Sequence, residues 1–193
     1  VMTDYLVVGH EYGDPFPVLI STIILHLAFR APEQESAFRE SKIMLDQLHA
    51  AGYGLGYSML VGQWAAGLLD YGDLVEAQNA VNEGFEHLKK VKSEYFQAEL
   101  HRLQGEIHRL NKQPEEVVEA SYLKAIEIAR KQSAKLFELR SAASLAHFYT
   151  SLDRTEEADR MLRPVFDWFD DGADCRDLHE ARGLLGETAD RLR

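Results

Sequence analysis

Arginine and glutamate alternate along one short segment of the chain, at Glu99, Arg102, Glu106 and Arg109. Their steps of 3, 4 and 3 residues put the four side chains on one face of a helix. An arginine guanidinium can bind a carboxylate or a phosphate through two parallel hydrogen bonds, so this face could bind an anion or an acidic peptide. The same spacing also lets the four residues pair with one another along a solvated helix. The sequence leaves both interpretations open.

Other chemically active residues lack the partners that catalysis or metal binding requires. His101 and His108 are seven residues apart, too far for a chelating pair without further ligands. The aspartates near the C-terminal end lack the alternating oxygen ligands and the final glutamate of a calcium loop; they are Asp167, Asp170, Asp171, Asp174 and Asp177. Cys175 has no committed histidine partner, and the chain has no GxxxxGK phosphate loop. We therefore predict no catalytic residue, no metal site and no cofactor, and we do not expect an enzyme.

The composition is typical of a soluble globular protein, with 46% hydrophobic and 27% charged residues among 193. A net charge of −11 disfavours binding to nucleic acid and to anionic membranes. Cys175 is the single cysteine, which excludes an intramolecular disulfide and favours a cytoplasmic location. The longest apolar run, Pro15–Phe29, is shorter than a membrane span and predicts a buried helix. Because no natural-looking start precedes this run, we expect a piece of a longer protein.

The elements that carry these residues recur along the chain with a period near 40 residues. Each copy contains apolar or small residues at steps of 4, 3 and 4, which is one face of a helix; the copies begin at Ala37, Ala77, Val118 and Ala158. A small or apolar residue stands 12 or 13 positions before each copy, inside a preceding apolar segment; these residues are Leu25, Ala65, Gly105 and Ala146. Each repeat is therefore expected to be a pair of helices.

We expect helices over 15–30, 33–50, 55–70, 74–91, 94–110, 115–132, 135–151, 154–169 and 175–191. They form one domain over 1–193, with units 14–51, 54–91, 94–132 and 135–170. The last helix has no partner, and its packing face of Leu178, Ala181, Leu184 and Leu185 predicts a cap over 174–192.

The spacing within each pair resembles the tetratricopeptide repeat. The fourth unit carries the resemblance best, with Leu145-Ala146, Tyr149, Ala158, Leu162 and Val165 at the positions of the repeat pattern. The resemblance implies an all-α, right-handed superhelix of about four helix pairs. The longer period indicates longer helices than those of a standard repeat.

In tetratricopeptide arrays the first helix of each pair lines a concave surface. The resemblance therefore implies a surface that binds a partner or ligand, with these residues on it: His26, Arg30, Met59, Glu99, Arg102, Glu106, Arg109, Arg140, His147 and Thr150. Its cationic members, Arg102, Arg109, Arg140 and His147, stand out in a chain of net charge −11. We expect a protein, an acidic peptide or a small anion as the ligand.

The second half of the chain is similar to the C-terminal repeats of large bacterial signalling proteins. The similar stretches are Ala98–Glu106, Ala125–Arg130, Glu138–Ala142 and Pro164–Phe169. In those proteins a class III adenylate or guanylate cyclase, or a LuxR-type DNA-binding domain, precedes a STAND-type ATPase and the repeats. The resemblance implies a non-catalytic binding and sensing module that acts on the ATPase or cyclase domains of its parent protein.

Two alternatives remain open at the level of sequence. The apolar segment Val18–Phe29 could instead mediate self-association into a homodimer, with no ligand bound in the groove. A metal-dependent enzyme that uses the histidines and aspartates is the weaker alternative.

Overall fold

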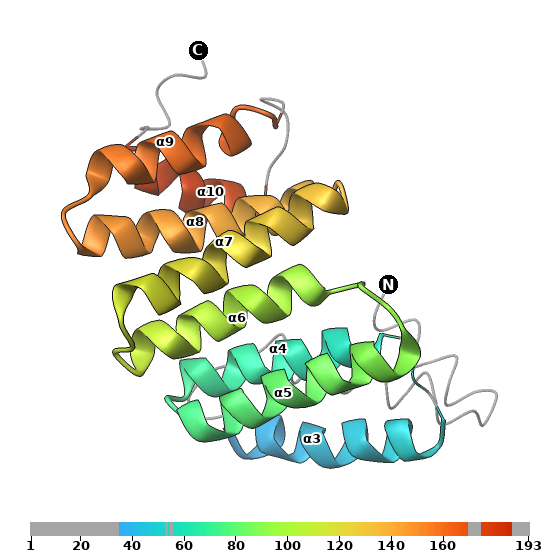
Figure 1. Ribbon diagram of the computed structural model, residues 1–193. Helices are drawn as coiled ribbons and strands as arrows, with labels where there is room; N and C mark the ends of the chain where they lie inside the picture. Colours follow the sequence, from blue (N-terminus) through green and yellow to red (C-terminus); the bar gives the residue numbers. More distant parts are fainter. Residues whose placement is uncertain (1–34, 53, 55, 170–174, 187–193) are drawn as a thin grey trace. The chain divides into compact units, whose positions relative to one another are not determined.

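The computed structural model describes residues 35–52, 54, 56–169 and 175–186 (Figure 1). Every element in these residues is an α-helix, which confirms the predicted all-α class. The helices are α3 (Glu35–Ala50), α4 (Tyr57–Asp70), α5 (Leu74–Val91), α6 (Gln97–Leu110), α7 (Glu115–Lys131), α8 (Lys135–Ser151), α9 (Thr155–Phe166) and α10 (Arg176–Leu184). The helix expected over 15–30, with His26 and Arg30, lies outside the described residues.

Residues with a left-handed backbone explain why two helices start later than expected. Gly56 precedes α4 with φ of 74°, and Phe96 precedes α6 with φ of 70°. Neither residue can continue a right-handed helix, so α4 and α6 begin at the next position. Phe96 keeps this conformation because its ring is buried and packs edge-on against Phe137, with centroids 5.4 Å apart.

The helix predicted as a cap over 174–192 is shorter than expected. It begins at Arg176 and ends at Leu184. The amide of Leu185 donates a hydrogen bond to the carbonyl of Ala181, and the amide of Gly186, which has a φ of 66°, donates to the carbonyl of Gly183. A left-handed glycine after the last turn is a common helix stop, and the prediction of a helix to residue 191 does not take Gly186 into account.

The chain divides into two compact units, 1–93 and 94–193. The division falls between the second and third predicted repeats. Each unit is described by itself below.

In the first unit, α4 packs against both α3 and α5. α4 is the most apolar of the three helices and is buried along most of its length, with Val61, Ala65 and Leu68 fully inaccessible. α3 contributes Phe38, whose ring stacks on Trp64 of α4 with centroids 6.2 Å apart. Asp73 is the N-cap of α5, and its side chain accepts a hydrogen bond from the amide of Glu76.

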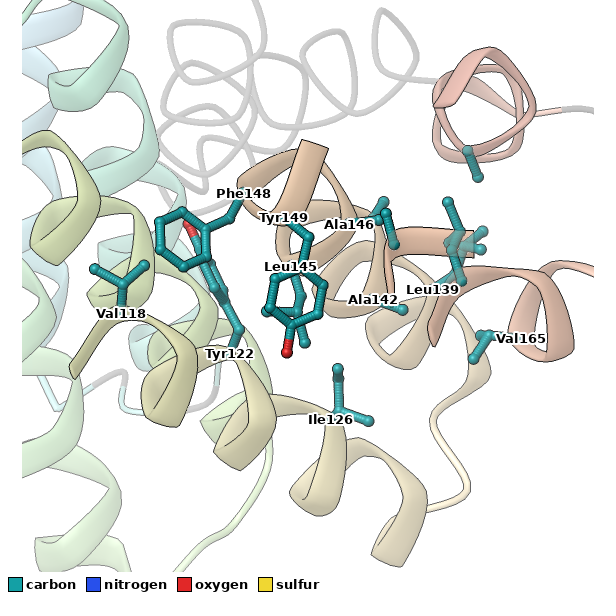
Figure 2. Packing of buried hydrophobic residues seen from close by; sticks show 14 of the residues in the cluster. Val118, Tyr122, Ile126, Leu139, Ala142, Leu145, Ala146, Phe148, Tyr149 and Val165 are labelled. Carbon is teal, nitrogen blue, oxygen red and sulfur yellow. The ribbon is translucent and has the colours of Figure 1, made fainter. Parts of the chain in front are cut away.

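In the second unit, consecutive helices pack on one another from α6 to α9. α6 also packs on α8, and α10 packs on both α8 and α9. Figure 2 shows the core between α7 and α8, where Tyr122 and Ile126 face Leu145 and Phe148. The short helix α10 covers this core by burying Leu178 and Ala181, as the sequence predicts for a cap.

Gly105 of α6 packs closely against Tyr122 of α7. A Cβ atom at this position would lie 2.6 Å from Cε1 of the Tyr122 ring, well inside van der Waals contact. The Tyr122 side chain is fully buried and cannot easily move away. The small residue that recurs in the repeat therefore allows the two helices of this pair to pack closely.

Candidate functional site

Glu99 and Arg102 form an ion pair on α6. The Arg102 guanidinium donates from Nε to Glu99 Oε2 at 3.0 Å and from Nη2 to Glu99 Oε1 at 2.7 Å, a bidentate arrangement. Only 5% of the Glu99 side chain and 17% of the Arg102 side chain are exposed. Both residues of the pair belong to α6, as one of the two interpretations predicts, but they are mostly buried and not on a solvated face.

Glu106 and Arg109 repeat this arrangement two turns further along α6. Arg109 donates from Nε and from Nη2 to Glu106 Oε2, at 3.0 and 2.8 Å. Its side chain is 32% exposed, about twice as exposed as Arg102. The pairing along one helix that the sequence allowed is thus present in both halves of the motif, and ligand binding by these residues stays a prediction.

Two further contacts extend this polar surface from α6 onto α8 and α10. Arg102 Nη1 donates to Ser144 Oγ on α8 at 3.3 Å. Arg140, also on α8, donates from Nε to Asp177 Oδ2 on α10 at 2.8 Å. We call Glu99, Arg102, Arg140, Ser144 and Asp177 the polar row. They connect α6 and α8, each the first helix of a pair in the predicted repeat, with the predicted capping helix α10.

The electrostatics of the polar row are dominated by its arginines. Burial alone would raise the pKa of the Glu99 carboxyl, but Arg102 opposes this, and Arg140 adds a weaker attraction. The net effect holds the pKa of Glu99 below its ordinary value, so Glu99 is ionised at neutral pH. Both arginines therefore balance a buried negative charge as well as facing solvent.

The remaining predicted site residues differ in accessibility. His147 and Thr150 are exposed on α8, and the Thr150 hydroxyl donates to the Ala146 carbonyl at 2.9 Å. Arg140 keeps 30% of its side chain exposed. Met59 is partly buried on α4 in the first unit, so it is not a member of the polar row. His26 and Arg30 lie outside the described residues.

Sequence reasoning singled out Glu99 as a site residue but missed Glu138 and Asp177, which occupy the equivalent place on the next two helices of the row. Glu99, Glu138 and Asp177 lie in the first turns of α6, α8 and α10 and recur every 39 residues. Glu138 is also buried and accepts from Arg130 Nε at 2.7 Å and from Lys135 Nζ at 2.8 Å. The helix dipole favours an acidic residue in the first turn of a helix. The recurrence of an acidic residue every 39 positions could therefore have been recognised in the sequence. Ser144 carries no comparable signal.

The histidines of α6 do not form a metal site. His108 lies between Gln104 Nε2 at 2.8 Å and Ser121 Oγ at 3.0 Å. The pKa of the partly buried His101 is lowered by burial and then by Lys124. Across the part of the chain that the structure describes, no group of three or more His, Cys, Asp or Glu residues could hold a metal ion. None of the helices in that part is long and apolar enough to cross a membrane.

Comparison with known proteins gives no match for this chain among family models, characterised proteins or solved structures.

Proposed function

We propose that the chain is a non-catalytic binding and sensing module, built as a right-handed, tetratricopeptide-like superhelix. The polar row is the observation that carries this proposal. It runs across α6, α8 and α10, the helices that would line the concave surface of such a superhelix. The packing of α6 on α8 and of α8 on α10 is also the order that a stack of helix pairs requires.

The surface suits a ligand with negative charge. Arg140 and Arg109 each keep about a third of the side chain exposed, while His147 lies exposed on the same helix as Arg140. Arg102, in contrast, already donates hydrogen bonds to both Glu99 oxygens and to Ser144. We therefore give it a structural role within the surface and not a direct contact with the ligand. We assign the main ligand contact to Arg140, with His147 two turns further along α8 and Arg109 on α6 as additional cationic residues.

The proposed mechanism is a change in helix packing on binding. A ligand that pulls Arg140 toward itself weakens the Arg140–Asp177 contact and so changes how α10 sits on α8. A ligand can bias an attached ATPase or cyclase domain only through such a difference between two states. An acidic protein segment and a small anion share this chemistry, and titrations with a glutamate-rich peptide and with inorganic phosphate distinguish them.

Substitution of Arg140 tests the proposal. We expect Arg140→Gln to weaken binding of the glutamate-rich peptide at least tenfold, because a charge-assisted contact is lost. Its ion pair with Asp177 is partly exposed and lies at the edge of the second unit, so its loss should cost about 1 kcal/mol and the fold should be retained. Lys124→Gln, an equal change of charge at an exposed position on α7, is the matched control and should bind as the parent does. Equal affinities of all three proteins would contradict the assignment.

The alternative of self-association keeps a test of its own. The segment that suggested it, Val18–Phe29, lies outside the described residues. A concentration-independent monomer mass in light scattering would exclude it, whereas a dimer that forms without ligand would favour it over the binding module.

A further inference from the structure

A second group of polar side chains lies in the first unit, away from the polar row. His49 is in the last turn of α3, Tyr57 is the first residue of α4 and His87 is near the end of α5. The rings of His49 and Tyr57 stack with centroids 4.0 Å apart. The His87 ring lies 5.0 Å from Tyr57 and 5.2 Å from His49. Three rings thus join three helices at one end of the unit.

His87 is held in this position as a neutral ring. Its side chain is buried, and Nε2 lies 3.2 Å from the Gly54 carbonyl, which requires a proton on Nε2. Nδ1 of the same ring is buried and has no hydrogen-bond partner. Protonation of Nδ1 would bury a positive charge without an acceptor, close to a second imidazole, His49, whose own Nδ1 is likewise buried without a partner.

The charged residues around the rings are already engaged with other groups. On α5, Glu83 accepts from the Tyr57 hydroxyl and from Lys42, and Lys90 adds positive charge. On α3, Asp46 pairs with Lys42. α4 contributes no charged residue at this end, since its first is Asp70. Burial is the largest effect on the pKa of His87 and lowers it. The hydrogen bond to Gly54 and the charge of Glu83 raise this pKa, whereas His49 and Lys90 lower it further. The net result is a lowered pKa.

We propose that His49 and His87 form a proton-sensitive lock that holds α3 against α4 and α5 at neutral pH and releases it under mildly acidic conditions. The other contacts of α3 are a few aromatic and aliphatic side chains and ion pairs such as Arg39–Asp73, at 3.1 Å. Carboxyl groups ordinarily titrate at about pH 4, and lysine and arginine above about pH 10. Between pH 7.5 and 5.5, histidine is therefore the group that titrates.

The sign of the effect follows from the lowered pKa of His87. The unfolded chain takes up a proton near pH 6.5, above the pKa of the folded state. The neutral ring therefore stabilises the unit fully above pH 6.5, and this stability is lost as the pH falls from there through the folded-state pKa. We expect the midpoint temperature of the first unit to fall on the order of 5 °C between pH 7.5 and 5.5.

The two tryptophans of the chain allow the first unit to be observed separately. Trp64 stacks on Phe38 of α3, and Trp168 belongs to the second unit and is 58% exposed. In a Trp168→Phe background, Trp64 emission reports directly on whether α3 is in place. We expect a red shift on acidification from pH 7.5 to 5.5, together with faster amide hydrogen exchange over Glu35–Ala50.

A double variant, His49→Phe with His87→Gln, should abolish both responses. Phenylalanine keeps a ring against Tyr57, and the glutamine amide can still donate to the Gly54 carbonyl. His179→Gln, at an exposed position on α10, is the matched control and should respond to pH as the parent does. An unchanged response in the double variant would overturn the proposal.

A histidine titration of the unaltered chain by NMR gives a second, independent result. The lock requires His87 to titrate below the ordinary histidine pKa of about 6.5. Titration of His87 at or above about pH 6.5 would overturn the proposal even if the double variant failed to fold.

Discussion

Replacing Arg102 by methionine is expected to lower the free energy of unfolding by about 3–5 kcal/mol, because Glu99 would then be a buried carboxylate without its partner. The bidentate contact and the 5% exposure of the Glu99 side chain make this pair different from an ordinary surface ion pair. Urea unfolding followed by circular dichroism measures the change. The expected loss is a large share of the stability of a domain of this size.

Two variants show whether the loss arises from the stranded carboxylate. Arg109→Met removes the more exposed second pair and should cost about 1 kcal/mol or less. The double variant Glu99→Leu with Arg102→Met removes both charges and should recover most of the stability lost in Arg102→Met. If the double variant is as unstable as the single one, the cost comes from lost packing and the electrostatic account is wrong.

The pH dependence of this pair has a definite sign. Because Arg102 and Arg140 hold the pKa of Glu99 below its ordinary value, the unfolded chain binds a proton at Glu99 before the folded chain does. The pair therefore stabilises the fold fully above about pH 4.3, and its contribution disappears as the pH falls through the folded-state pKa. Acid unfolding of the second unit should steepen in this window, and Glu99→Gln should remove that part of the slope.

Gly105→Ala is the second change with a large expected effect. Alanine favours a helix over glycine by about 1 kcal/mol, so propensity alone predicts a gain in stability. The added Cβ would instead lie 2.6 Å from the fully buried Tyr122 ring and force α6 and α7 apart. Overpacking of this kind costs about 1–3 kcal/mol, and we expect the net effect to be destabilising. Thermal unfolding of the variant measures it.

The chain offers a control at another helical glycine. Gly183 lies in α10, and a Cβ added there would meet nothing within 4 Å. Gly183→Ala should therefore stabilise the protein slightly, by up to about 1 kcal/mol. A second test combines Gly105→Ala with Tyr122→Leu, which should cost less than the sum of the two single changes. A stabilising effect of Gly105→Ala by itself would show that the close approach of α6 and α7 is not important.

The helix pairs could be predicted because they depend on local periodicity. The small residues Ala65, Gly105 and Ala146 and the copies that begin at Ala77 and Val118 all fall within observed helices. The copy that begins at Ala158 extends to Phe169, three residues past the end of α9 at Phe166. Helix ends were predicted less well where a backbone conformation decides them. Phe96 takes a left-handed φ because its ring packs on Phe137, a contact between residues far apart in the sequence.

The partners within the candidate site were predictable only in part. The spacing of Glu99 with Arg102 and of Glu106 with Arg109 indicates pairing along one helix, and both pairs form. Asp177 as the partner of Arg140 depends on how α10 docks on α8, which no local pattern specifies. The same holds for His49 and His87, which meet only because α3 and α5 end on the same side of the unit.

The central claim is that α6, α8 and α10 present a surface for an anionic ligand, and backbone NMR during a titration with the glutamate-rich peptide tests it most directly. The account predicts saturable shift changes that centre on Arg140 and His147 and extend to Asp177 on α10, with inorganic phosphate as the small-anion comparison. Shifts confined to other helices, or none at millimolar peptide and phosphate, would contradict it.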